Sequence, residues 1–470
     1  SIHSKCSALP SAPLADPCAE AKPHSSPFLS IHGSFSRPAR GGWVMAMTTR
    51  KLQLAALCAS LVLASSAAAQ KYNAVYSFGD SITDTGNLCT NGRPSAITFT
   101  QPPYGETYFG SPTCRCSDGR VIVDFLSTKF GLPFLPPSKS TSADFKKGAN
   151  MAITGATAMD APFFRSLGLS DKIWNNGPIS FQLQWFKQIT SAVCGSSKHS
   201  LIYLSSIQFN SNPLSVCLYV CTRTAAASFP AATQKRLYFS WAPPDHPDVL
   251  SITRRCAGCK SYLSSSLFIF GEFGGNDYNA MLFGNYNTDQ ASTYTPQIIS
   301  TIGDGVEKLL ALGAVDVVVP GVLPIGCFPI YLSIYGTSSA ADYDALGCLK
   351  KFNDLSSNHN SQLQAKLSAL QAKYKSARIM YADFYSGVYD MVRSPSKYGF
   401  SSVLEACCGS GGGKYNYANS ARCGMSGAAA CASPASHLSW DGIHLTEAAY
   451  KQITDGWLNG AFCKPAILHS

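Results

Sequence analysis

The stretch YSFGDSITDTGN, residues 76–87, places a serine directly after a short apolar run. That run, residues 74–78, is rich in aromatic and β-branched side chains, which is typical of a buried strand. Gly79, Asp80 and Ser81 then form an ordinary turn sequence, because glycine accepts positive φ angles and Asp and Ser bond their own backbone. A serine becomes a nucleophile only when a base activates it and a further group orients that base. The rest of the chain must therefore decide what Ser81 does.

Further apolar runs of the same kind predict buried parallel strands, each ending in glycine or polar residues: 267–270, 315–319 and 378–382. Helical patterns lie between them, one over 301–312 with Ser300 or Thr301 as its cap, and a long one within 343–374. Strands that alternate with helices predict an α/β fold, a three-layer α/β/α sandwich with a central parallel sheet. In such sheets ligands bind beyond the carboxyl ends of the strands, where Ser81 would lie.

Two segments differ from this pattern. Residues 45–69 contain a basic start at Arg50, an apolar run and small residues before Ala69, which predicts a secretory signal peptide cleaved near Ala69. We expect residues 1–44 to be translated from upstream of the true start and to be disordered. We also expect that the chain has no stable membrane span. Residues 198–258 lack helical and strand periodicity, so we expect either an insertion or, as we favour, a retained intron within one domain over 70–470.

Charge and cysteine content change once these segments are set aside. The chain has a formal net charge of +10, but residues 1–69 and 198–258 each contribute +4, which leaves +2. We therefore expect no nucleic-acid partner. Of the 18 cysteines, 12 remain, an even number that predicts disulfides in a secreted chain. Their connectivity does not follow from the sequence, although Cys194 and Cys259 are the first candidate pair because they flank 198–258.

A possible base stands near the C-terminus in SWDGIHLTEAAY, residues 439–450. Asp441 and His444 are three positions apart, which on a helical turn places both side chains on one face. An aspartate there can accept the Nδ1 proton of the histidine and leave Nε2 free as a base. The alternative is a helix start with Asp441 as the cap. Alone, this spacing is a weak signal.

Two glycine-rich segments could hold the negative charge that a serine nucleophile creates on a carbonyl oxygen. In GEFGGNDYN, Asn276 offers a side-chain amide, and the neighbouring glycines permit close approach of a substrate. In KGANMAITGATAMD, Gly155 offers a backbone N–H that no side chain blocks. Each segment is equally compatible with a simple glycine turn. No G-x-S-x-G sequence is present, which disfavours the usual α/β-hydrolase architecture.

In their order along the chain, the motifs that contain Ser81, Gly155, Asn276 and the pair Asp441 and His444 together resemble the plant GDSL esterase/lipase family, a branch of the SGNH hydrolases. RCSDGRVIVDF, VPGVLPIGC and ACCGSGGGKYNY also resemble that branch, over about residues 70–197 and 259–465. The resemblance implies a flavodoxin-like SGNH hydrolase fold. It implies a serine ester hydrolase with Ser81 as nucleophile, Asp441 and His444 completing the triad, and Ser81, Gly155 and Asn276 as oxyanion donors.

The resemblance also sets expectations for the surroundings of the site. Asp80 and Asp84 are expected to organise the turn, and Cys114 stands where a small residue is expected, which predicts an extra thiol. The substrate would be a small-molecule or polysaccharide-borne ester, with a short acyl or acetyl group. No metal or organic cofactor is expected. The alternatives are an acyltransferase that uses the same serine and a variant inactivated by residues 198–258. No oligomeric state is predicted.

Overall fold

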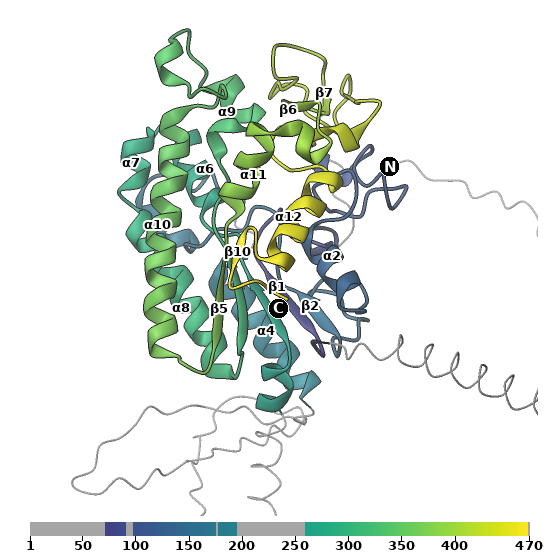
Figure 1. The fold of residues 1–470 in the computed structure, drawn as a ribbon, viewed down its shortest axis with the longest axis vertical. Coiled ribbons are helices and arrows are strands. Elements are labelled where there is room, and N and C mark those ends of the chain that lie inside the picture. Colours follow the sequence, from purple (N-terminus) through teal and green to yellow (C-terminus); the bar gives the residue numbers. More distant parts are fainter. Residues whose placement is uncertain (1–70, 91–96, 175–176, 195–258, 469–470) are drawn as a thin grey trace, which may run out of the picture. The chain divides into compact units, whose positions relative to one another are not determined.

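The computed structural model describes residues 71–90, 97–174, 177–194 and 259–468 (Figure 1). The predictions for residues 1–44, for the signal peptide at 45–69 with cleavage near Ala69, and for the segment at 198–258 lie outside these residues. All structural statements below concern the described ranges.

A six-stranded sheet forms the centre of the fold, in the order β10-β5-β4-β3-β1-β2. Its strands are β1 (Val75–Phe78), β2 (Gly148–Asn150), β3 (Leu267–Phe270), β4 (Asp316–Pro320), β5 (Arg378–Ala382) and β10 (Cys463–Lys464). All neighbours pair in parallel except β10, which is antiparallel to β5. The five parallel strands thus have the flavodoxin-like order 2-1-3-4-5. The connections reverse direction between β1 and β3, and such switch points are where open sheets bind ligands.

Helices cover both faces of the sheet. They are α2 (Ile122–Lys129), α3 (Ala161–Ser166), α4 (Ile179–Val193), α6 (Gly275–Phe283), α7 (Thr288–Ser292), α8 (Thr295–Leu312), α9 (Pro329–Ile334), α10 (Lys350–Lys373), α11 (Phe384–Arg393) and α12 (Glu447–Asn459). Helix α8 packs against α4 and α10, whereas α12 packs against α2 and α11. Figure 1 shows α8 and α10 on one side of the strands and α2 and α12 on the other. The predicted three-layer α/β fold is confirmed.

The remaining elements are short. Two small ribbons lie outside the central sheet: β6 (Ser402–Ala406) pairs with β9 (His437–Ser439), and β7 (Cys408–Gly409) pairs with β8 (Ala429–Ala430). Single 3₁₀ turns occur at η1 (Asn87–Cys89), η2 (Thr98–Thr100), η3 (Ile325–Cys327), η4 (Ala340–Asp342), η5 (Pro395–Tyr398) and η6 (Pro434–Ser436). The main core forms between the sheet and its helices. A second, smaller apolar cluster contains Phe99, Tyr104, Cys116, Cys407, Cys408, Cys423 and Trp440.

The four predicted strands are present as β1, β3, β4 and β5, and the long helix within 343–374 is α10. The helix predicted over 301–312 begins six residues earlier, at Thr295, so a cap at Ser300 or Thr301 was wrong. Pro296 occupies its first turn, where a missing N–H costs little, and the buried Ile298 and Ile299 extend the apolar face. Strands β2 and β10 were not predicted, because they are only three and two residues long.

The described cysteines form five disulfides: Cys89–Cys114, Cys194–Cys259, Cys327–Cys348, Cys407–Cys431 and Cys408–Cys423. The first candidate pair, Cys194 and Cys259, is confirmed. Cys114 as an extra thiol is wrong, since it pairs with Cys89; within the described residues the free thiols are Cys116 and Cys463, both buried. Among these residues no helix is long and apolar enough to cross a bilayer.

Candidate functional site

Ser81 lies three residues beyond the end of β1, at the switch point between β1 and β3. Gly79 turns the chain with a φ of +144°, and a Cβ there would stand 2.8 Å from the carbonyl oxygen of Gly271, which follows β3. The two strand ends therefore approach closely only because residue 79 is glycine. Gln182 of α4 holds this turn, donating to the Gly79 carbonyl at 2.7 Å and accepting from its N–H at 2.9 Å.

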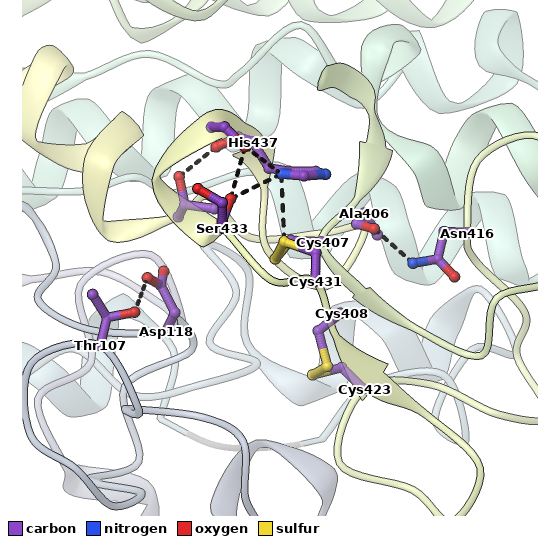
Figure 2. The surroundings of a disulfide bond; sticks show 12 residues. Thr107, Asp118, Ala406, Cys407, Cys408, Asn416, Cys423, Cys431, Ser433 and His437 are labelled. Atoms are coloured by element: carbon purple, nitrogen blue, oxygen red, sulfur yellow. Dashed lines mark hydrogen bonds between the residues drawn. A yellow bond between two sulfur atoms is a disulfide. The ribbon is translucent and has the colours of Figure 1, made fainter. Parts of the chain in front are cut away.

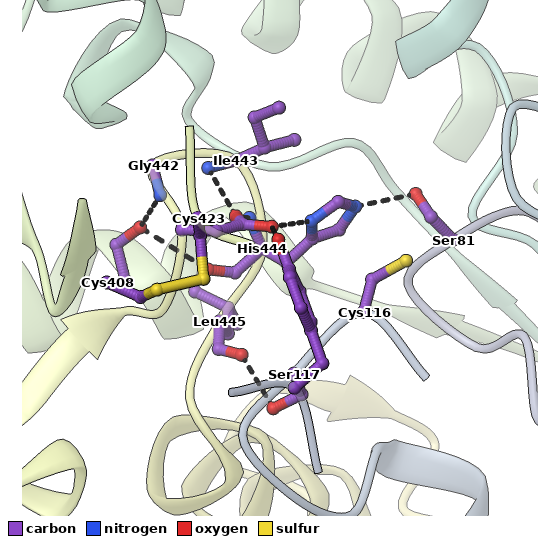
Figure 3. Close-up of polar contacts among 12 residues, drawn as sticks. Ser81, Cys116, Ser117, Cys408, Cys423, Gly442, Ile443, His444 and Leu445 are labelled. Carbon is purple, nitrogen blue, oxygen red and sulfur yellow. Dashed lines mark hydrogen bonds and ion pairs between the residues drawn. A yellow bond between two sulfur atoms is a disulfide. The ribbon is translucent and has the colours of Figure 1, made fainter. Parts of the chain in front are cut away.

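The structure brings Ser81, His444 and Asp441 together in a hydrogen-bonded row. The Ser81 Oγ lies 2.8 Å from His444 Nε2, and His444 Nδ1 lies 2.7 Å from Asp441 Oδ2. All three are buried, with exposed fractions of 7%, 2% and 3%. Figure 3 shows the His444 ring directed at the Ser81 hydroxyl. This arrangement lets the imidazole take the serine proton while the carboxylate orients the ring.

The spacing of Asp441 and His444 does not lie on a helical turn, and Asp441 is not the cap of the next helix. Helix α12 begins at Glu447 and is capped by Thr446, whose side chain accepts from the N–H of Ala449. Asp441 instead closes a loop: its Oδ1 accepts from the N–H groups of Ile443 and His444 at 2.9 and 2.7 Å. Oδ1 thus holds the backbone of the loop, and Oδ2 faces the imidazole of His444.

The loop of Asp441 and His444 rests on the smaller apolar cluster. The N–H of Trp440 donates to the His444 carbonyl at 2.8 Å, and the N–H of Cys408 donates to the Trp440 carbonyl at 2.6 Å. Cys408 is in turn bonded to Cys423, and the preceding Cys407 to Cys431 (Figures 2 and 3). The two disulfides therefore hold Cys407 and Cys408 in place, and the loop of Asp441 and His444 is hydrogen-bonded to this pair through Trp440.

Asp84 connects the serine turn to the segment that contains Gly155. Its carboxylate accepts from the N–H groups of Gly86, Asn87 and Thr154 at 2.8, 2.7 and 2.9 Å, and from the Thr154 hydroxyl at 3.1 Å. Burial raises the pKa of Asp84 against the effect of these bonds. Asp84 is thus a structural hub, as expected for a residue that organises the turn.

Two of the predicted oxyanion donors are backbone N–H groups without a hydrogen-bond partner among the described residues. Within the described residues, no hydrogen bond occupies the N–H of Ser81 or that of Gly155. Gly155 has a φ of +81°, and a Cβ there would stand 3.1 Å from the side chain of Trp174. The amide of Asn276, in the first turn of α6, donates to Asp80 Oδ2 at 2.7 Å and to the Ala156 carbonyl at 3.0 Å. The predicted donors therefore lie on segments that meet at Ser81.

Buried carboxyl groups surround the serine turn. Burial raises the pKa of Asp80 to about 6, and the bond from the Ile82 N–H and the nearby His444 oppose this rise. Burial also raises the pKa of Glu272 well above its usual value, and Asp80 adds to that rise. Asp441 differs: burial acts to raise its pKa, but His444 and three hydrogen bonds outweigh it, so the pKa is lowered. The carboxyl that faces the imidazole therefore differs from Asp80 and Glu272, because its surroundings favour the anion.

One group of described side chains has the proximity of a metal site. The Sγ atoms of Cys407 and Cys431 and a ring nitrogen of His437 lie within 4.8 Å of one another (Figure 2). Both sulfur atoms belong to a single disulfide, so neither is available as a thiolate ligand. These residues do not fit a metal ion in this state.

Sequence reasoning missed two side chains at the site. Tyr104 donates its hydroxyl to Asp441 Oδ2 at 2.7 Å, although 337 positions separate the two residues. Trp174, which is 45% exposed, lies against Gly155. Neither residue stands in a recognisable motif, so no local signal could have identified them.

Comparisons with known proteins identify the family of this chain. The model of the GDSL-like lipase/acylhydrolase family matches residues 75–457. A GDSL esterase/lipase of Arabidopsis thaliana is 37% identical over 402 residues, covering 84% of this chain and 92% of the relative. A sinapine esterase of Brassica napus is 35% identical over 413 residues, covering 87% and 90%. The chain therefore belongs to the GDSL-like lipase/acylhydrolase family, and it is a carboxylic ester hydrolase.

Proposed function

We propose that Ser81, His444 and Asp441 form the catalytic triad of this ester hydrolase. His444 Nε2 takes the proton of Ser81 Oγ as that oxygen attacks the ester carbonyl, and the imidazolium then protonates the leaving alcohol. Water, activated by the same nitrogen, releases the acid from the acyl-enzyme and regenerates Ser81. Asp441 stabilises the imidazolium through Nδ1. The observation that carries this proposal is the row of 2.8 and 2.7 Å contacts.

We further propose that the oxyanion is bound by the N–H groups of Ser81 and Gly155 and by the amide of Asn276. The two backbone donors have no partner among the described residues, and a preorganised donor stabilises developing charge strongly when water is excluded. Both protons of the Asn276 amide are engaged, by Asp80 and Ala156. The oxyanion therefore has to share or replace one of these bonds, and the longer bond to Ala156 is the one that yields more easily.

For the substrate we propose esters with a short acyl or acetyl group, carried by a small molecule or a polysaccharide. The relatives are named as esterases, and one is a sinapine esterase. We also propose that the protein is secreted after cleavage near Ala69. Five disulfides support an oxidising compartment. N-terminal sequencing of protein collected from the medium tests the cleavage; a mature N-terminus far from residue 70 would contradict it.

A serine-reactive phosphonate tests the assignment of the nucleophile. We expect the probe to label Ser81 alone, as located by peptide mass spectrometry, and to abolish hydrolysis of nitrophenyl acetate in step with labelling. Ser81→Ala should lose both labelling and at least about 10⁴-fold in kcat, with unchanged circular dichroism. Labelling of another serine, or more than a few per cent of activity in Ser81→Ala, would remove Ser81 from this role.

A further inference from the structure

An aromatic wall runs from the proposed triad to the surface. Tyr104, which donates to Asp441, meets Phe99 edge to face, with ring centroids 5.7 Å apart. Phe99 also meets the His444 ring edge to face, at 5.2 Å and 88°. The next ring is Trp174, 6.0 Å from Phe99 and tilted by 32°. The wall thus begins beside the base and ends at an indole.

The outermost ring of this wall is accessible. Tyr104 and Phe99 are 1% and 8% exposed, whereas Trp174 is 45% exposed. Trp174 is also the one tryptophan among the large apolar side chains that the described part of the chain exposes to solvent. Burying such an indole is favourable, because aromatic side chains carry the largest apolar areas. The exposed face of this indole is therefore available to an apolar partner.

The position of Trp174 relates this surface to the bound ester. Atoms Cβ, Cγ and Cδ2 of Trp174 pack where a Cβ of Gly155 would stand, at 3.1–3.2 Å. The indole therefore covers the residue whose N–H is proposed to hold the oxyanion. A carbonyl bound by the Gly155 N–H lies beside the residue that the indole covers, so one of its two substituents can reach the indole.

We propose that Trp174 is a specificity-determining residue that binds an aromatic ring of the substrate ester. The inference rests on the proposed catalytic role of Ser81, since that role places the ester carbonyl beside Gly155. A flat ring can stack on the indole in the offset geometry that aromatic pairs prefer. A ring on the alcohol is compatible with the proposed short acyl group, whereas a ring on the acyl group would replace it, and the esters below distinguish the two.

A cationic substrate group fits this surface less well, although tryptophan also attracts cations. His444 becomes positively charged when it takes the serine proton, and its ring lies against Phe99 in the same wall. A second positive charge on the substrate would be repelled at that step. Phe99 and Gly155, which pack against Trp174, carry no negative charge that would attract a cation.

The test compares kcat/KM for matched esters in Trp174→Ala and the unaltered protein, so that intrinsic reactivity cancels within each ester. Phenyl acetate against cyclohexyl acetate places the ring on the alcohol, and methyl benzoate against methyl cyclohexanecarboxylate places it on the acyl group. Ethyl acetate is the reference without a ring. We expect a loss of about 2- to 12-fold for one aromatic ester, mainly through KM, with a smaller loss for its cyclohexyl counterpart.

Two further variants control the comparison. Trp174→Phe keeps a flat ring and should retain most of the selectivity even if Trp174→Ala disturbs Gly155. Phe283→Ala removes an exposed ring at the far end of α6, about 10 Å along the helix from Asn276, and should change nothing.

Equal losses for aromatic and cyclohexyl esters, or no hydrolysis of either aromatic ester, would overturn the inference. So would a selective loss for acetylcholine, which would identify a cation site instead. Failure of the proposed function has a different signature: the unaltered protein and Ser81→Ala would then cleave ethyl acetate equally slowly.

Discussion

Ser81 follows a strand of the central sheet, whereas Asp441 and His444 lie in a loop outside it. Strand β1 is buried along its whole length and pairs with β2 and β3, so the serine turn grows directly out of the main core. The loop of His444 rests instead on the smaller cluster around Trp440, which contains three cysteines of two disulfides. One side of the site is held by sheet pairing, the other by covalent bonds.

The two sides also differ in their electrostatics. Around Ser81, burial raises the pKa values of Asp80 and Glu272. On the other side, the pKa of Asp441 is lowered, because His444 and backbone N–H groups outweigh its burial. Burial therefore shifts the carboxyls near Ser81 toward their neutral forms, whereas the surroundings of the carboxyl that faces His444 favour its anion. The smaller cluster around Trp440 thus supports a loop with an ionised Asp441, because disulfides and hydrogen bonds restrain that loop.

The largest effect short of removing Ser81 or His444 is expected on the base side, for Asp441→Asn. An asparagine has one acceptor oxygen, but Asp441 accepts from two backbone N–H groups, from Tyr104 and from His444. If the NH₂ group takes the place of Oδ2, it faces Tyr104 and the imidazole, which loses its acceptor; if it takes the place of Oδ1, it faces the two backbone N–H groups, and the loop that positions His444 is disturbed. We expect kcat to fall by about 10²- to 10⁴-fold. A fall of less than tenfold in stopped assays with nitrophenyl acetate would mean that Asp441 only shapes the loop.

On the nucleophile side, Asn276→Ala should lower kcat by about 10²- to 10³-fold with little change in KM, because an oxyanion donor acts mainly in the transition state. Asn279→Ala is the matched control. Asn279 lies one turn further along α6 and donates to Asn276 Oδ1 at 3.4 Å, so its loss should cost far less. Steady-state kinetics on one ester separate the two. A change in KM alone would assign Asn276 to substrate binding.

The covalent support of the base side can be broken separately. Replacing both Cys408 and Cys423 by serine opens a loop with a sequence separation of 15, and the same change at Cys327 and Cys348 opens one of 21. Loop-closure entropy predicts a similar loss for each, about 3 kcal/mol of unfolding free energy. We expect kcat to fall in the first variant only, because of these two disulfides only Cys408–Cys423 supports the His444 loop. Urea unfolding and kinetics measure both quantities; equal kcat losses would contradict the comparison.

The smallest effect concerns pH. The pKa of Asp80 is about 6 in the folded protein, above its ordinary value of 3.8, so its contribution to stability is complete below about pH 4 and is lost as the pH rises through 6. The expected loss is about 2 to 3 kcal/mol. Asp441 acts oppositely, since its lowered pKa stabilises the fold above about pH 4. Urea unfolding at pH 4 and pH 7 should show less loss in Asp80→Asn; an unchanged loss would contradict the shift.

Much of the proposed site has local signals in the sequence. Turn residues after a buried run, a DxxH sequence and two glycine segments predict roles for Ser81, His444, Asp441, Asn276 and Gly155 without any knowledge of contacts. What stayed hidden depends on residues that meet only in space. Tyr104 and Asp441 are far apart in the chain, and Trp174 stands in no motif, so its approach to Gly155 follows from the path of the chain between α3 and α4.

By itself, the sequence determined the alternation of strands and helices, the family and the residue types of the site, because burial periodicity and motifs are properties of short stretches. The tertiary structure decided which of those residues meet. It placed Ser81 and His444 at 2.8 Å across 363 positions, paired Cys114 with Cys89 while leaving Cys116 free, and made the Asp441 turn a loop rather than a helix. Hydrogen bonds and disulfides need particular distances and directions, and those arise only when the sheet and its helices have packed.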